Sequence, residues 1–152
     1  MNLQIQNNQN KIKINRRKIR GTIGKITKML DCADKELSLC FIDDEKIKQL
    51  NKQYLGKNKA TNVLSFSLRE DEYGNVNPHV LGDIVISVET AERDALESGL
   101  TIAQEIDFLL IHGLLHLLGY NHENATKKEK NIMQMKEKEL FNIVNGGYVE
   151  LI

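Results

Sequence analysis

Apolar residues in the first third of the chain recur with the periods of both strands and helices. Leucine and isoleucine alternate with glutamines over residues 3–6, and isoleucines alternate with lysines over residues 11–14. This pattern predicts one or two short strands near the start. Isoleucines at helical spacing over residues 19–30 then predict a helix. Residues 36–42 alternate as a half-buried strand does, and residues 43–54 have the spacing of a second helix.

The middle of the chain predicts two strands joined by a polar stretch. Residues 56–62 are typical of a loop, and residues 62–68 are rich in strand-forming side chains. The strand expected over residues 82–88 is a plausible neighbour for that strand in the sheet. A short helix over residues 89–98 should end at Gly99.

The last third of the chain predicts two helices, one of them buried. Thr101 and Gln104 have the spacing of a capping box, and apolar residues surround the helix expected over residues 106–118 on all sides. A charged helix should follow over residues 126–144. Strands and helices interleave, so we expect residues 1–152 to form a single α+β domain, with a small mixed β-sheet packed against helices and the central apolar helix in the core.

Charge and cysteine content narrow the class of protein. The formal net charge is zero, yet residues 1–30 carry eight Lys and Arg and no acid. That asymmetry fits either a polyanionic partner or a solvated amphipathic helix. Cys32 and Cys40 match neither a redox pair nor a cysteine zinc site. The N-terminus has no secretory pattern and the apolar window of residues 108–118 is too short to span a bilayer, so we expect a cytoplasmic protein.

The segment HGLLHLLGYNH holds three of the four histidines of the chain. His112 and His116 are four residues apart, so a helix places them on one face, one turn apart. Gly119 follows where helices commonly end in a left-handed residue, and that reversal can bring His122 back toward the pair. Three imidazoles with one open position for water are the ligands of a catalytic zinc site. We therefore expect one Zn²⁺ per chain, bound by these three histidines.

Other interpretations of the same residues stay open. The spacing of the histidines is that of metzincin proteases, but Gly113 occupies the position of their glutamate base. His112 and His116 could also be hydrogen-bonded core histidines, with His122 in a loop. His79 is interpreted as a surface residue, and less readily as a fourth ligand. Three residues are candidates to orient a ligand imidazole: Asp83, Asp107 and Asn121.

Three motifs in register resemble the YbeY family of bacterial endoribonucleases. They are HGLLHLLGYNH at residues 112–122, LNKQYLGKNKATNVLSFSL at residues 50–68 and LGDIVISVETAERDA at residues 81–95. The resemblance implies an α+β fold with zinc on the three histidines. It also implies cleavage of single-stranded RNA, maturation of the 3′ end of small-subunit rRNA, and partnership with the ribosome or its small subunit, including ribosome quality control.

The chain departs from the family pattern at four positions. Leu55 stands where the family usually has an arginine, which removes a cation that could hold phosphate. Ala60 replaces a usual proline, and Asn62 and Asn121 stand where aspartate is common. Asn121 keeps an acceptor oxygen without the negative charge, so its support of a ligand histidine would be weaker.

The leading hypothesis is a zinc-dependent RNA hydrolase in which His112, with a metal-bound water, is catalytic. Lys57, Lys59 and the basic N-terminal helix are candidates to hold phosphates. Ser65 and Ser67 could face the metal, although alternation on a half-buried strand is the commoner explanation, and neither is assigned a catalytic role. Two alternatives remain: a zinc-stabilised RNA-binding or ribosome-assembly factor with weak or no cleavage, and a metalloprotease.

Overall fold

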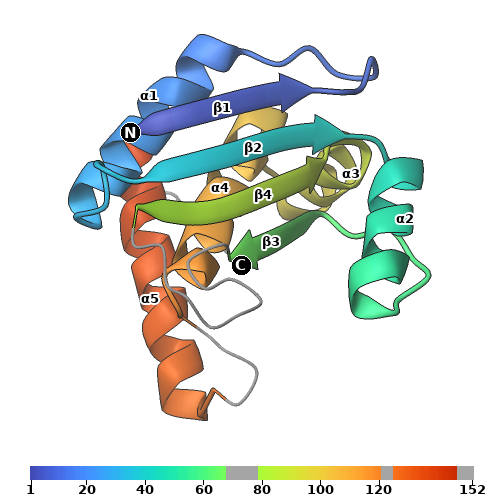
Figure 1. Ribbon diagram of the computed structural model, residues 1–152. Coiled ribbons are helices and arrows are strands. Elements are labelled where there is room, and N and C mark those ends of the chain that lie inside the picture. The colour runs from blue at the N-terminus through green and yellow to red at the C-terminus, as the bar shows by residue number, and fades with distance from the viewer. Residues whose placement is uncertain (68–78, 121–124, 147–152) are drawn as a thin grey trace.

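The computed structural model describes residues 1–67, 79–120 and 125–146, which form a four-stranded sheet with helices packed on it (Figure 1). The elements in chain order are β1 (Asn2–Asn7), α1 (Arg16–Met29), β2 (Glu36–Ile42), α2 (Asp44–Leu55), β3 (Val63–Ser67), β4 (Val80–Ser87), α3 (Val88–Ser98), α4 (Ile102–Leu117) and α5 (Lys127–Val144). The α+β class predicted from the sequence is confirmed.

The sheet is mixed, with strand order β1-β2-β4-β3. β1, β2 and β4 run parallel, and β3 pairs antiparallel with β4. The predicted pairing of β3 with β4 is confirmed. Of the one or two strands predicted near the start, β1 forms, whereas residues 11–14 form no strand. The Gln9 side chain binds that backbone instead: its Oε1 accepts from the amides of Lys11 and Ile12, and its Nε2 donates to the carbonyl of Ile12.

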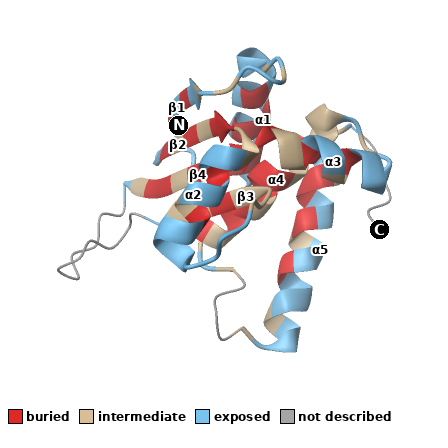
Figure 2. Ribbon diagram, turned by 90° about the vertical axis from the view of Figure 1, so that its right-hand side faces the viewer, coloured by how far each residue is buried: buried red, intermediate tan, exposed pale blue. Residues whose placement is uncertain are grey.

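The core lies between one face of the sheet and helices α1, α4 and α5, with α4 buried along most of its length (Figure 2). Each large apolar side chain that is fully buried in this core stabilises the fold by about 1.5–3 kcal/mol. The fully buried side chains of this cluster include Ile23, Ile26, Leu37, Leu39, Phe41, Ile84, Ile86, Leu109, Leu110, Leu114, Leu140 and Phe141. α4 is thus the central apolar helix that the sequence predicts.

The close approach of α4 to the sheet depends on Gly113. A Cβ atom at this position would lie 3.0 Å from Cδ1 of Ile84 in β4. Glycine therefore lets the helix backbone rest directly on β4. This contact sets the height of the neighbouring His112 above the sheet.

Two arginines of α1 cover the free edge of β1. Arg16 donates to the carbonyl of Ile5 at 2.7 Å, and Arg20 donates to the carbonyl of Leu3 at 3.1 Å. Unpaired carbonyls on an edge strand invite pairing with another chain, and cationic side chains block such pairing. Part of the positive charge of this helix therefore serves the sheet, a role beside the two that the sequence left open, a polyanionic partner and a solvated amphipathic helix.

Helix α2 lies beside β3 and β4, and its first residue contacts the start of α3 (Figure 1). It packs through a small second cluster that includes Ile42, Ile47, Leu64 and Val85. Within residues 1–67, 79–120 and 125–146, no single helix is long and apolar enough to cross a bilayer; α3 and α4 pass that test only as a pair bent by 109°.

Candidate metal centre

His112 and His116 lie on the same face of α4, at its C-terminal end. Their Nε2 atoms are 3.0 Å apart, and the ring planes meet at 71°. Both side chains are partly buried. The predicted juxtaposition of the two imidazoles is confirmed, and both rings turn the same nitrogen toward a common point.

Glu137 of α5 holds the other side of the His112 ring. Its Oε1 lies 2.7 Å from Nδ1 of His112, and Glu137 is only 7% exposed. A carboxylate at this distance favours a proton on Nδ1, which leaves the lone pair on Nε2 free to bind a cation. The pair has the geometry of a carboxylate that orients a metal-binding histidine.

His116 is tuned toward its neutral form. Burial lowers the pKa of its imidazole, and the adjacent His112 lowers the pKa further. A neutral imidazole is the form that binds metal ions. The site therefore offers deprotonated nitrogen at neutral pH.

A cleft of about 370 Å³ opens in front of the two histidines. β3 forms its opposite wall, and Leu55 from the end of α2 contributes to the rim. Ser65 and Ser67 line this cleft together with the other residues of β3.

The donor set fits a zinc ion as far as the described residues reach. Two nitrogen ligands of a tetrahedral zinc are about 3.3 Å apart, close to the spacing of the two Nε2 atoms. Gly119 has φ +95° just after α4, in the left-handed region expected for the reversal. His122 and Asn121 lie outside the described residues. Among the residues that are described, no group of three His, Cys, Asp or Glu side chains could hold a metal ion.

The carboxylate that contacts His112 is not one that the sequence suggested. Asp107 accepts a hydrogen bond from Thr22 at 3.2 Å and faces Lys18 at 4.0 Å. Asp83 lines a separate hollow with Ser38 on the other face of the sheet, and burial raises the pKa of its carboxyl.

Among the described residues, Glu137 is the acid beside a histidine of the pair, whereas the sequence offered Asp83, Asp107 and Asn121 as candidates. A sequence signal for it exists, since Glu137 lies four residues after Met133 and three before Leu140. It is therefore an isolated acid on the buried face of α5.

Lys57 and Lys59 are exposed on the loop that joins α2 to β3. Asn51, which is 2% exposed, holds this loop: its Nδ2 donates to the carbonyl of Lys59 at 3.0 Å, and its own carbonyl accepts from the amide of Lys57 at 3.2 Å. The loop follows Leu55, which lines the histidine cleft. Both lysines are thus presented on an anchored backbone that follows a residue of the cleft lining.

His79 is exposed at the start of β4, where its carbonyl accepts from the amide of Glu36 at 2.7 Å. It is absent from the residues that line the histidine cleft. A larger hollow of about 610 Å³ lies on the opposite face of the sheet, and its lining includes no histidine. The smaller cleft is therefore the candidate site, because it holds the histidine pair, although the other hollow has the larger volume.

Position 113 argues against the metalloprotease alternative. A protease of this spacing needs a glutamate there, and the space is filled by the contact between Gly113 and Ile84. The Cβ of a glutamate at this position would crowd the Ile84 side chain.

The fold and the site together define the class: a small α+β protein whose central helix presents a histidine pair to a cleft edged by a strand. The family model described as Endoribonuclease YbeY matches residues 4–145. The chain therefore belongs to the YbeY endoribonuclease family.

Relatives extend this match over nearly the whole chain. Endoribonuclease YbeY of Syntrophus aciditrophicus is 54% identical over 146 residues, which cover 96% of this chain and 91% of that protein. The Geobacter sulfurreducens protein of the same name is 41% identical over 98% of this chain and 100% of its own length. The solution structure of TM1509 from Thermotoga maritima superposes with a TM-score of 0.66 at 28% identity, covering 95% of this chain and 89% of that one.

Proposed function

We propose that this protein is a zinc-dependent endoribonuclease that cuts single-stranded RNA. Its substrate is the 3′ end of small-subunit rRNA, which it matures in the cytoplasm in association with the ribosome, and it takes part in ribosome quality control. Family membership supports the endoribonuclease activity. One observation carries the metal dependence: the Nε2 atoms of His112 and His116 converge at 3.0 Å in an open cleft.

The proposed zinc site combines three histidines with one buried glutamate. His112, His116 and His122 would hold the zinc, with Glu137 fixing the tautomer of His112. The bound ion would lower the pKa of a water molecule toward neutrality and stabilise negative charge on a phosphoryl oxygen. For this reason the missing glutamate at position 113 matters less for phosphodiester cleavage than for peptide hydrolysis.

RNA would be held mainly through its phosphates. Lys57 and Lys59, exposed on the loop after Leu55, would supply positive charge, and contacts of lysines with phosphates give affinity without sequence preference. Ser65 and Ser67 offer hydroxyl groups on the wall opposite the histidines. Leu55 and Leu117 contribute apolar surface to the lining of the same cleft.

The test is RNA cleavage with and without a chelator. Purified wild-type protein should cut single-stranded RNA, lose activity in the chelator and regain it with added zinc. His116→Ala should be inactive, whereas His79→Ala removes an exposed histidine away from the cleft and should cut normally. Cleavage that persists in the chelator would contradict the proposal.

A second candidate function is an RNA-binding or ribosome-assembly factor with weak cleavage. The observation that favours it is Leu55, which places apolar surface on the rim of the cleft. If this second function holds, wild-type protein should bind RNA without cutting it, and Leu55→Arg should raise cleavage. Equal, robust cleavage by both forms would dismiss it.

A further inference from the structure

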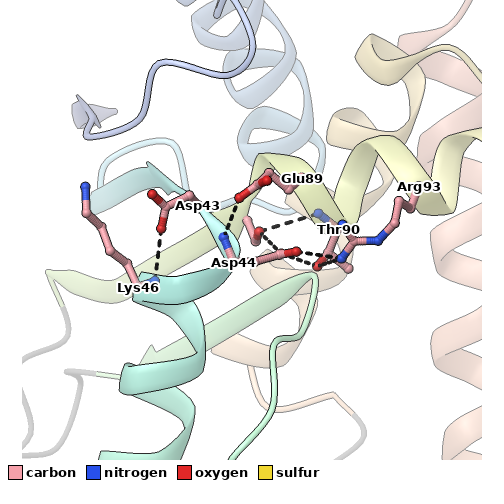
Figure 3. A network of polar contacts seen from close by, with 7 residues as sticks. Asp43, Asp44, Lys46, Glu89, Thr90 and Arg93 are labelled. Carbon is pink, nitrogen blue, oxygen red and sulfur yellow. Dashed lines mark hydrogen bonds and ion pairs between the residues drawn. The ribbon is translucent and has the colours of Figure 1, made fainter.

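Asp44, the first residue of α2, gathers three side chains from the junction of β4 and α3 (Figure 3). Its Oδ1 accepts from the hydroxyls of Ser87 and Thr90, both at 2.6 Å. Its Oδ2 accepts from the guanidinium of Arg93 at 2.7 Å. Partial burial raises the pKa of the Asp44 carboxyl, but these hydrogen bonds outweigh it and hold that pKa below its usual value.

Backbone groups reinforce the same junction. The amide of Asp44 donates to Oε1 of Glu89 at 3.0 Å. At the far end of the α2–β3 segment, Asn62 donates to Oδ2 of Asp94 at 3.1 Å, and its carbonyl accepts from the amide of Ser87 at 3.0 Å. The whole segment from α2 to β3 is thus tied at both ends to the start of α3.

A change in the angle of α2 at Asp44 displaces the C-terminal end of the helix. Twelve residues make a helix about 18 Å long, so a tilt of about 10° at Asp44 moves the C-terminal end by about 3 Å. That end carries Leu55 on the rim of the histidine cleft and leads into the loop with Lys57 and Lys59. Contacts to a reacting substrate tolerate displacements of about 1 Å or less.

We propose that Asp44 is a positioning residue for RNA: its contacts with Ser87, Thr90 and Arg93 set the angle of α2 and so the location of the loop with Lys57 and Lys59 that follows Leu55. The inference rests on the proposed function only in taking RNA as the ligand of these lysines. Asp44 touches neither the histidines nor the cleft lining. Replacement of Asp44 should therefore weaken RNA binding and leave the proposed metal site unchanged.

The neighbouring Asp43 provides a matched control. It is the N-cap of α2, and its Oδ1 accepts from the amide of Lys46 at 3.0 Å (Figure 3). Loss of either carboxylate weakens the same helix end and removes the same charge. Only Asp44 makes the side-chain contacts that reach α3.

The experiment compares Asp43→Ala and Asp44→Ala in the full chain. It measures the urea midpoint of unfolding, zinc bound per chain, the Kd for a fluorescein-labelled single-stranded RNA, and kcat and KM for its cleavage. We expect Asp44→Ala to raise Kd and KM about tenfold, with kcat within about twofold and zinc content unchanged. Asp43→Ala should lower the urea midpoint while leaving Kd and KM within about twofold.

Two results would overturn the assignment: an unchanged Kd in Asp44→Ala, or an equal rise in Asp43→Ala. If Asp44→Ala does not fold, Arg93→Ala and Thr90→Val each remove one contact, and an unchanged Kd in both is equally decisive. Wild-type protein that binds RNA without cutting it would contradict the endoribonuclease proposal alone, because the Kd comparison still tests Asp44.

Discussion

Replacement of Glu137 should weaken zinc binding without removing a ligand. The buried carboxylate lies 2.7 Å from Nδ1 of His112, at the short end of the range for charge-assisted hydrogen bonds. Without it, His112 loses the partner that holds its ring and keeps the proton on Nδ1. Partners of this kind typically contribute about 10–100-fold to metal affinity, which corresponds to about 1.4–2.7 kcal/mol.

The assay is a zinc titration in competition with a chromophoric chelator. We expect Glu137→Ala to raise the Kd for zinc about 10–100-fold and Glu137→Gln, whose amide oxygen can still accept from Nδ1, to raise it about tenfold or less. Asp107→Asn is the control, because this buried aspartate of α4 binds Thr22 instead of a histidine.

The reasoning fails if Glu137→Ala folds normally and binds zinc as tightly as the wild type. It fails as well if Asp107→Asn loses as much affinity, since the effect would then follow from any buried charge near α4. Urea unfolding of each variant without zinc separates a weakened site from a weakened fold.

Further predictions concern the fold around the site. Burial raises the pKa of the Glu105 carboxyl to about 7, because the buried site favours the neutral form. The contribution of Glu105 to stability is therefore fully present below about pH 4.5 and is lost as the pH rises through 7. Glu105→Gln should therefore lose less stability than the wild type between pH 6 and 8, with a gap in unfolding free energy approaching about 3 kcal/mol at high pH; parallel curves would contradict this. Gly113→Ala should lower unfolding free energy by about 1–3 kcal/mol, because its Cβ would crowd Ile84; an unchanged thermal midpoint would argue against that contact. The double variant Arg16→Ala, Arg20→Ala should self-associate in light scattering because it uncovers the edge of β1; a monodisperse variant would show that the edge needs no cover.

The local spacing of apolar residues was enough to predict most of the helices and strands. The four-residue spacing of His112 and His116, with Gly119 after them, was sufficient to place both rings on one helix face near its end. The absence of a strand at residues 11–14 has an equally local cause. The sequence there alternates as a strand does, but the Gln9 side chain takes the backbone amides that a strand would need. Alternation alone does not reveal such competition.

Contacts between segments far apart in the sequence could not be predicted from the spacing of residues. Glu137 meets His112 across 25 residues, and Asp44 meets Thr90 across 46. Such pairs depend on how helices pack, whereas a sequence pattern describes one helix at a time. Asp107 was a reasonable candidate because it shares α4 with the histidines, yet it points to α1.

The most direct test of the metal centre is the zinc X-ray absorption spectrum of the protein loaded with one equivalent of zinc. We expect three histidine nitrogens and one oxygen at about 2.0–2.1 Å. A first shell made mostly of oxygen, or one holding a single imidazole, would contradict the convergence of His112, His116 and His122 on a common ion.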